Sequence, residues 1–485
     1  MDLRMAEVFR FCVFLGLVLV SVWGVDGSNG VFRVQHKYKG TEKFTLGTLR
    51  DHDMRRHGRL LFDVEIPLGG NGNPSASGLY FTKIQIGNPS KDYYVQVDTG
   101  SDILWVNCVG CNKCPTKSDL GIKLSLYDPK ESSTAHLVTC EESSCAMIYA
   151  GTLSGCEADL LCNYQVTYGD GSSTSGYFVQ DDIHYDRVSG NLQTTTANGS
   201  VVFGCGAKQG GQLSSSGEAV DGIVGFGQAN SSMLSQLATA GKVKKMFAHC
   251  LDGVNGGGIF AIGEVVLPKL NSTPLVPHQA HYNVIMKSIE VAGDVIEPST
   301  VTTSGSHSAA ILDSGTTLAY LPDGVYDELM SKITAQQPDL SIHTVEDTFK
   351  CFQYTKDLDD GFPDVKLHFD NSLTMTVYPH EYLFEIRPEV WCFGWQNSGL
   401  QSKDGKDVTL LGDLVLSNKL IVFDLVNQTV GWTEYNCSSS IKLKDESDNV
   451  YTVNAQDIAA GSSLTSWKSL TFFILLVISL FIICH

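Results

Sequence analysis

Two short segments of this sequence could perform acid–base chemistry together. Asp98-Thr99-Gly100-Ser101 and Asp313-Ser314-Gly315-Thr316 each follow an apolar, strand-like run, at residues 95–97 and 310–312. Downstream of each lies a further match, two apolar residues followed by glycine: Gly222-Ile-Val-Gly225 after the first and Leu410-Leu-Gly412 after the second. One such turn is an ordinary Asx or type II turn, but the paired pattern predicts two copies of one structural unit.

Two carboxylates brought together by such a duplication cannot both ionise easily. Like charges at close range raise one pKa, so the pair shares a proton at acidic pH. One carboxylate can then activate a water molecule while the other protonates a carbonyl group. Because the titration belongs to the pair, neither Asp98 nor Asp313 receives a fixed role. The glycine in each turn permits backbone geometry closed to other residues, and the flanking hydroxyls can hold the carboxylates.

The surrounding elements are predicted to be mostly short strands. Apolar and polar residues alternate at residues 80–87 and 93–97, and a turn-rich stretch at 88–90 separates them. Many further runs are separated by Gly, Asn and Ser, in a chain with 47 glycines. A helical pattern covers residues 325–336, after a Pro-Asp-Gly turn. The first copy of the unit is longer than the second, and its extra length coincides with cysteines between Cys108 and Cys162.

Composition excludes several functional classes. The chain has 485 residues, a net charge of −19 and 43% hydrophobic residues, so a large core is possible and nucleic-acid binding is disfavoured. No Gly-x-Ser-x-Gly or phosphate-binding loop occurs, and His380-Glu381 lacks the second His of a zinc peptidase. Cys108-x-x-Cys111-x-x-Cys114 resembles half of a zinc site, but no matching Cys/His pair follows. No metal and no cofactor is therefore expected.

The N-terminus has the features of a secretory signal peptide over residues 1–27: basic residues, a short apolar run, then small residues. A transmembrane anchor is the alternative, but the run is short for it. In a secreted protein, the twelve cysteines other than Cys12 and Cys484 are expected to form six disulfides. Secretion is also consistent with the five N-glycosylation sequons, at Asn198, Asn230, Asn271, Asn427 and Asn436.

Residues 28–70 are more basic than the acidic body that follows. We expect a pro-segment that lies in an acidic cleft by charge complementarity, rather than a merely solvated extension. At the other end, small residues at 459–463 precede a polar spacer and a short apolar run at 470–484. This arrangement predicts a GPI-anchor signal with attachment at Gly461, and Ala460 and Ser462 as neighbouring choices. A short tail-anchoring helix is the alternative.

With both aspartate motifs in view, the chain resembles a pepsin-type aspartic protease of the nepenthesin-like, atypical plant branch, over residues 78–437. The resemblance implies a mostly β, bilobed fold with a cleft between two pseudo-dyad-related lobes. It implies that Asp98 and Asp313 are catalytic and that Thr99 and Ser314 interlock beneath them. Ser101 and Thr316 would bond the outer carboxylate oxygens, with Gly100 and Gly315 in the same turns and Gly225 and Gly412 in the loops behind them. Tyr168-Gly169 would belong to a flap hairpin, supported by Trp105. Without the resemblance, Tyr168 would be interpreted only as an aromatic residue of a strand before a glycine turn.

The same resemblance implies a disulfide pattern, since connectivity cannot be derived from sequence. The implied pairs are Cys108–Cys111, Cys114–Cys205, Cys140–Cys162, Cys145–Cys156, Cys250–Cys437 and Cys351–Cys392. The short distance from Asp313 to Gly412 leaves no room for the saposin-like insert of the vacuolar plant enzymes, which argues against that type.

The predicted organisation is a signal peptide (1–27), a pro-segment (28–70), an N-terminal lobe with a Cys-rich insertion (71–285), a C-terminal lobe (286–440), a linker (441–461) and a removed GPI signal (462–485). The predicted function is a secreted endopeptidase, active at acidic pH, on the outer face of the plasma membrane. Its substrates are proteins or peptides, and a monomer is expected. The alternatives are a non-catalytic inhibitor or binding protein of the same fold and a purely structural surface glycoprotein, which leaves the paired motifs unexplained.

Overall fold

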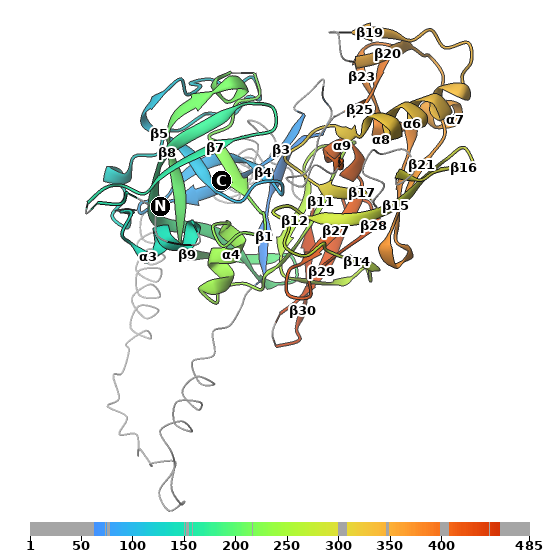
Figure 1. Cartoon of the computed structure of the whole chain (residues 1–485). Coiled ribbons are helices and arrows are strands. Elements are labelled where there is room, and N and C mark those ends of the chain that lie inside the picture. Colours follow the sequence, from blue (N-terminus) through green and yellow to red (C-terminus); the bar gives the residue numbers. More distant parts are fainter. Residues whose placement is uncertain are drawn as a thin grey trace, which may run out of the picture. The chain divides into compact units, whose positions relative to one another are not determined.

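The computed structural model describes residues 63–455 except 73, 75–77, 150, 152–154, 158, 216, 299–307, 346–348, 398–406 and 446 (Figure 1). The predicted signal peptide, most of the predicted pro-segment and the C-terminal tail with Gly461 lie outside the described residues. No helix among the described residues is long and apolar enough to cross a membrane.

A 15-stranded sheet contains the N-terminal half of the described chain and two strands from near its C-terminal end. Its order is β14-β28-β27-β11-β12-β1-β8-β9-β5-β10-β4-β3-β2, and β6 and β7 pair with β8. Its strands are β1 (Val64–Ile66), β2 (Leu68–Asn71), β3 (Leu79–Ile86), β4 (Lys91–Asp98), β5 (Trp105–Asn112), β6 (His136–Leu137), β7 (Asn163–Thr167), β8 (Ser173–Gly190), β9 (Gln193–Gly210), β10 (Gly222–Gly225), β11 (Met246–Leu251), β12 (Gly258–Ile262), β14 (Ser272–Pro274), β27 (Lys419–Asp424) and β28 (Thr429–Glu434). We call β3–β10 the N-terminal lobe.

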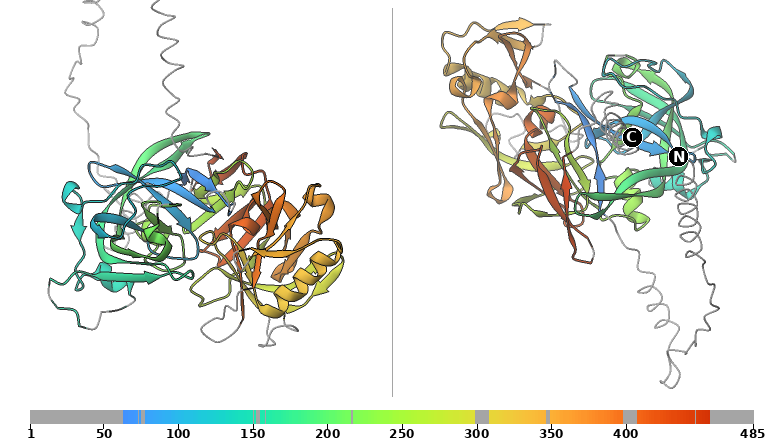
Figure 2. Two further views of the ribbon diagram at one scale, coloured as in Figure 1. Left: turned by 90° about the horizontal axis from the view of Figure 1, so that it is seen from above. Right: turned by 180° about the vertical axis from the view of Figure 1, so that it is seen from behind.

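The C-terminal lobe is built on an eight-stranded sheet of order β22-β21-β15-β17-β26-β18-β25, with β16 paired to β15. Figure 2 shows this lobe, in yellow to orange, beside the blue-to-green N-terminal lobe in both views. Its strands are β15 (Asn283–Val291), β16 (Asp294–Ile296), β17 (Ser308–Leu312), β18 (Ala319–Leu321), β21 (Val365–Phe369), β22 (Thr374–Val377), β25 (Trp395–Asn397) and β26 (Val408–Leu411). A four-stranded sheet adds β19 (His343–Val345), β20 (Phe349–Gln353), β23 (Leu383–Arg387) and β24 (Val390–Phe393).

A fourth sheet, of three strands, joins β13 (Glu264–Leu267) to the hairpin β29 (Ser440–Lys444) and β30 (Val450–Asn454). The helices are short: α3 (Ser143–Ile148), α4 (Met233–Thr239), α6 (Asp323–Ala335), α7 (Leu358–Gly361), α8 (Pro379–Tyr382) and α9 (Asp413–Leu416), with 3-10 turns η1 (Pro129–Glu131), η2 (Gly211–Ser214) and η3 (Asp370–Ser372). The predicted helix over 325–336 is confirmed by α6. It begins two residues earlier than expected, with Pro322 at the N-cap position and the acidic residue Asp323 in the first turn, where the helix dipole favours a negative charge.

The predicted repeat appears as one topology used twice. In the N-terminal lobe, β10 runs parallel to β4, with Gly225 opposite Asp98, and antiparallel to β5. In the C-terminal lobe, β26 runs parallel to β17, with Leu411 opposite Leu312, and antiparallel to β18. In both lobes, therefore, the strand that ends at or just before an aspartate is paired in parallel with the strand that ends at or just before the matched glycine.

The two lobes share a core through the sheet that joins them. β11 pairs with β27 over five residues of each strand, and their phenylalanines Phe247 and Phe423 stack with ring centroids 4.5 Å apart. β1 inserts between β12 and β8 in the same sheet, and all three of its side chains are buried. Residues 63–70 of the predicted pro-segment thus form part of the main sheet in this structure.

Candidate active site

The two predicted catalytic aspartates have matched environments. Asp98 is the last residue of β4, and Asp313 directly follows β17. The backbone N–H of Gly100 donates to Oδ1 of Asp98 at 2.8 Å, and that of Gly315 donates to Oδ1 of Asp313 at 2.8 Å. The other oxygen of each carboxylate accepts a hydroxyl hydrogen bond, from Ser101 to Asp98 and, at 2.7 Å, from Thr316 to Asp313. Each carboxylate is therefore oriented by its own turn.

The two turns face each other at very close range. A Cβ atom placed on Gly100 would lie 2.4 Å from Oδ1 of Asp313, and one placed on Gly315 would lie 2.1 Å from Oδ1 of Asp98. Both distances are far below van der Waals contact, so glycine is required at each position for the carboxylates to meet. Glycine is needed here because any side chain would collide with the opposite carboxylate. A special backbone conformation is not the reason, since neither glycine has a positive φ.

Burial and mutual repulsion raise the pKa of Asp98 to about 7. The larger cause is burial, because the residue is 5% exposed, and the second is the neighbouring charge of Asp313. The hydrogen bonds from Ser101 and Gly100 act in the opposite direction. A proton is therefore held between the two carboxyl groups at acidic pH, the state that general acid–base catalysis by such a pair requires.

Beneath the carboxylates, Thr99 and Ser314 interlock the two lobes. The Ser314 N–H donates to Oγ1 of Thr99 at 2.9 Å, and the Thr99 N–H donates to Oγ of Ser314 at 3.2 Å. Each hydroxyl also donates across the lobes, from Thr99 to the Leu312 carbonyl at 3.2 Å and from Ser314 to the Val97 carbonyl at 3.1 Å. Both side chains are buried, so four hydrogen bonds fix the separation of the two strands that carry the aspartates.

The matched glycines lie directly behind the aspartate turns. A Cβ atom on Gly225 would lie 2.3 Å from the carbonyl carbon of Asp102, and one on Gly412 would lie 2.3 Å from the Thr316 carbonyl oxygen. The adjacent backbone is hydrogen-bonded to the aspartates: Phe226 N–H to the Asp98 carbonyl at 2.7 Å, and Asp313 N–H to the Leu411 carbonyl at 3.0 Å. The glycines let a second strand pack against each turn and hold it.

Tyr168 lies at the end of a hairpin formed by β7 and β8. The Tyr168 N–H donates to the Ser172 carbonyl at 2.9 Å, and Gly169 is exposed in the turn between them. The indole N–H of Trp105 donates to the Tyr168 hydroxyl at 2.7 Å. Burial raises the pKa of Tyr168, and the charge of Asp98 adds to the effect, so this hydroxyl lies within electrostatic range of the carboxyl pair. The hairpin, its tyrosine and the supporting tryptophan are arranged as the resemblance implies.

Sequence reasoning missed one residue at the site, Asp413. It is 1% exposed, and neither carboxylate oxygen has a hydrogen-bond partner among the described residues. Burial, followed by the charges of Asp313 and Asp98, raises its pKa well above the usual value. A signal was available, since the residue after the matched glycine is Phe226 in the first copy and Asp413 in the second.

Two of the six expected disulfides are present, Cys250–Cys437 and Cys351–Cys392. The other four expected pairs, Cys108–Cys111, Cys114–Cys205, Cys140–Cys162 and Cys145–Cys156, are wrong, because the structure has Cys108–Cys205, Cys111–Cys114, Cys140–Cys156 and Cys145–Cys162.

Strand pairing explains the disulfides of Cys108, Cys111, Cys114 and Cys205. Burial around helix α3 accompanies those of Cys140, Cys145, Cys156 and Cys162. β5 runs parallel to β9 with Val106 opposite Cys205, which brings Cys205 beside Cys108, and Cys111 is left to pair with Cys114. All four cysteines of this region lie in or against one apolar cluster, and within it the two fully buried ones, Cys145 on α3 and Cys162, pair with each other. With all three cysteines of the zinc-like motif in disulfides, none of them is available as a metal ligand.

Asparagines of all five sequons are exposed. Their occupancy stays a prediction, as does the lipid attachment at Gly461.

Comparison with known proteins identifies the family. The chain matches the family models described as xylanase inhibitor N-terminal, over residues 80–264, and xylanase inhibitor C-terminal, over 281–434. It is 52% identical to aspartic proteinase 36 of Arabidopsis thaliana, over 96% of this chain and 97% of that one, and 47% identical to aspartic proteinase 39, over 94% of each. The chain therefore belongs to the pepsin-fold aspartic proteinase family, in the group that the xylanase inhibitor models describe.

Solved structures support the fold. Basic 7S globulin from soybean aligns with a TM-score of 0.60 at 22% identity, covering 77% of this chain and 96% of that one. Conglutin gamma from lupine seeds aligns with a TM-score of 0.62 at 20% identity, covering 78% and 96%. The family matches thus carry the names of proteinases and of xylanase inhibitors, and the globulins share the fold, so function has to be argued from the site.

Proposed function

We propose that the protein is an aspartic endopeptidase that hydrolyses peptide bonds at acidic pH. The observation that carries the proposal is the pair of carboxylates, each oriented by one glycine N–H and one hydroxyl and each lying against the glycine of the opposite turn. With one proton shared by the pair, the ionised carboxylate takes a proton from a bound water, and the protonated carboxyl donates to the carbonyl oxygen of the substrate. The flap tyrosine Tyr168 covers the substrate.

The finer assignment is to the nepenthesin-like branch, in secreted and GPI-anchored form. Six disulfides are consistent with an oxidising compartment, and the exposed sequons are consistent with glycosylation there. The anchor rests on the small residues at 459–463 and the apolar run at 470–484. On this proposal the mature enzyme lies on the outer face of the plasma membrane, where it acts on proteins or peptides.

The second candidate is a non-catalytic inhibitor or binding protein. It is favoured by the names of the matched family models and by the seed globulins among the structural neighbours. A non-catalytic relative is expected to lose one of its aspartate motifs, and here both turns retain the aspartate, the glycine and the hydroxyl in hydrogen-bonded geometry.

Peptide hydrolysis by the purified chain at acidic pH, compared with Asp98→Asn and Asp313→Asn, separates the two candidates. We expect cleavage by the natural chain, inhibition by a statine-type transition-state mimic and a loss of at least about 10³-fold in either variant, since each removes one member of an acid–base pair that acts as a unit. Both variants should retain the disulfides and the unfolding transition of the natural chain. Substantial cleavage by folded Asp98→Asn would exclude the assignment of the pair.

A further inference from the structure

A pocket of about 550 Å³ lies apart from the carboxylate pair, where α8 approaches the start of β27 and the end of β28. Its volume falls in the range typical of small-molecule sites. Its lining is polar and aromatic, with three carboxylates among the residues Asp252, Tyr378, Glu381, Asn418, Glu434 and Asn436. We call it the α8 pocket.

The walls of the α8 pocket are fixed by internal contacts. The Tyr378 hydroxyl donates to Oε1 of Glu434 at 2.9 Å, and the rings of Tyr378 and His380 are parallel with centroids 5.7 Å apart. Glu381 forms a buried ion pair of 2.6 Å with Lys419. The pocket thus combines a rigid, flat aromatic surface with hydrogen-bond acceptors. A sugar ring presents an apolar C–H face and a rim of hydroxyl donors, so this surface matches it chemically.

Asn436 lines this pocket and begins the sequon Asn436-Cys437-Ser438. Its Oδ1 accepts the Ser438 N–H at 3.1 Å, while the Ser438 hydroxyl donates to Asp252. Within the described part of the chain its Nδ2, the atom that would carry a glycan, has no hydrogen-bond partner. At two other sequons that nitrogen is engaged, with Asp424 at 2.6 Å for Asn427 and with Asp182 at 3.2 Å for Asn198.

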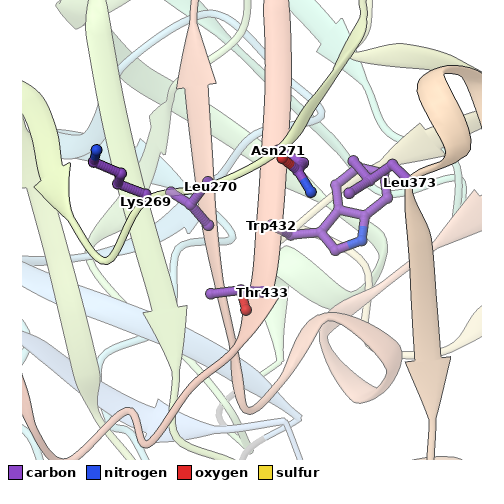
Figure 3. Close-up of a pocket in the computed structure, with 6 residues that line it drawn as sticks. All are labelled: Lys269, Leu270, Asn271, Leu373, Trp432 and Thr433. Atoms are coloured by element: carbon purple, nitrogen blue, oxygen red, sulfur yellow. The ribbon is translucent and has the colours of Figure 1, made fainter.

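A second pocket, shown in Figure 3, provides a comparison. It is lined by Asn271, also a sequon asparagine, whose side chain points toward the indole of Trp432. Its volume of about 160 Å³ is that of about five waters, at roughly 30 Å³ each. Trp432 is 4% exposed, and its N–H is taken by the Thr374 carbonyl at 3.0 Å, so it offers no open ring face. None of the described residues that line this pocket carries a carboxylate.

We propose that Asn436 carries an N-linked glycan whose first N-acetylglucosamine residues lie in the α8 pocket, against Tyr378 and within reach of Glu434. In the transfer, Nδ2 forms a bond to C1 of a sugar donated by a polyprenyl-diphosphate oligosaccharide. The C1–O bond to the diphosphate breaks with its electron pair, and Nδ2 loses one proton. The transfer acts on the unfolded chain, because in the folded protein Cys437 is held by Cys250 and the Ser438 hydroxyl by Asp252.

The inference rests on the proposed entry into the secretory pathway but not on peptidase activity. The test uses full-length protein secreted from a eukaryotic cell line and treated, in the native state, with peptide N-glycosidase F. Glycopeptide mass spectrometry then follows each sequon separately. We expect the Asn436 peptide to carry a glycan, absent in Asn436→Gln, that is released at least about tenfold more slowly than glycans at other sequons, a factor that one aromatic contact can supply.

Tyr378→Ala removes the proposed stacking surface and should bring release at Asn436 to the rate of the other sites. Tyr149→Ala is the matched control, since Tyr149 is also partly exposed and its hydroxyl also donates one hydrogen bond, to Asn163 in the N-terminal lobe. If Tyr378→Ala does not fold, Glu434→Gln, which keeps the size of the side chain, should give a smaller acceleration. An unmodified Asn436 beside other occupied sequons, or equal release rates at all sites, would overturn the inference while leaving secretion intact. Absence of glycan at every sequon would overturn both, and the acid peptidase assay would remain a separate test of function.

Discussion

Tyr168 shows how a single hydrogen bond can position a residue near the carboxyl pair. The indole N–H of Trp105, which is 2% exposed, donates to the Tyr168 hydroxyl at 2.7 Å, so the core of the N-terminal lobe holds the tip of the β7–β8 hairpin. The tyrosine is partly exposed and lies at the edge of the apolar cluster that contains Trp105. The charge of Asp98 acts on its hydroxyl, so the residue is near enough to the carboxyl pair for the proposed role to be tested by substitution.

Replacing Tyr168 should affect turnover more than stability. We expect Tyr168→Ala to lower kcat at acidic pH by roughly tenfold or more, a loss of about 1.4 kcal/mol in transition-state binding. Tyr168→Phe, which keeps the ring and loses one hydrogen bond, should have the smaller effect, and the stability of both should fall by only about 1 kcal/mol. Steady-state kinetics with thermal unfolding checks this, and unchanged kinetics in Tyr168→Ala would mean that this hairpin does not cover the cleft.

At the scale of elements, disulfides tie together segments that the strand order has already made neighbours. Cys108–Cys205 links the parallel strands β5 and β9 and closes a loop of sequence separation 97, whereas Cys111–Cys114 closes a separation of only 3. In the chain-entropy account the long loop contributes about 4–5 kcal/mol and the short one much less. The short disulfide therefore shapes the end of β5, and the long one stabilises the lobe.

The corrected pairing predicts which thiol each cysteine variant releases. Cys111→Ser should leave Cys114 free to react with a maleimide, while Cys108 stays protected and the protein stays folded. Cys108→Ser should release Cys205, and the Cys108→Ser/Cys205→Ser double variant should lose several kcal/mol of unfolding free energy. Alkylation followed by peptide mass spectrometry distinguishes the cases. A reactive Cys108 in the Cys111→Ser protein would restore the pairing that the family resemblance implies.

For the whole molecule, buried titratable groups favour a folded state in mild acid. Burial raises the pKa of Asp63 and Asp98 to about 7 and that of Asp221 to about 6. In the unfolded chain these carboxyl groups ionise near pH 4, before they ionise in the folded chain. Each of them therefore lowers the free energy of unfolding as pH rises from about 4 toward neutral. His249 acts in the opposite direction. It is fully buried, stacks near Phe260 and Phe423, and has no partner for either ring nitrogen among the described residues, and burial lowers its pKa to about 3.

Thermal stability should therefore be greatest at mildly acidic pH, and His249 should limit it on the acid side. The unfolded chain binds a proton at His249 below about pH 6.5 and the folded chain only near pH 3, a cost of up to about 5 kcal/mol at low pH. His249→Phe should thus raise the unfolding temperature by an amount that grows as pH falls from 7 to 3. His343→Gln, at an exposed position, is the control. Unfolding scans across this pH range with disulfides intact check it, and a pH-independent gain would exclude the titration of His249 as the cause.

The sequence by itself determined the features that repeat or alternate locally. The two Asp-Thr/Ser-Gly turns, the matched glycines Gly225 and Gly412 and helix α6 all appear where their patterns predict them, because strand alternation, turn chemistry and helical spacing are read from neighbouring residues. The family resemblance added the placement of Tyr168 beside Trp105.

Only the tertiary structure decided which distant residues meet. Cysteine partners depend on the register of β5 against β9 and on the face that α3 buries, and neither is written in the spacing of the cysteines. The same holds for Asp413 and His249. The position of Asp413 after the matched glycine marks it in the sequence, but its burial, like that of His249, follows only from the packing of the folded chain around it. Burial is a property of the assembled sheets, and burial is what shifts their pKa values.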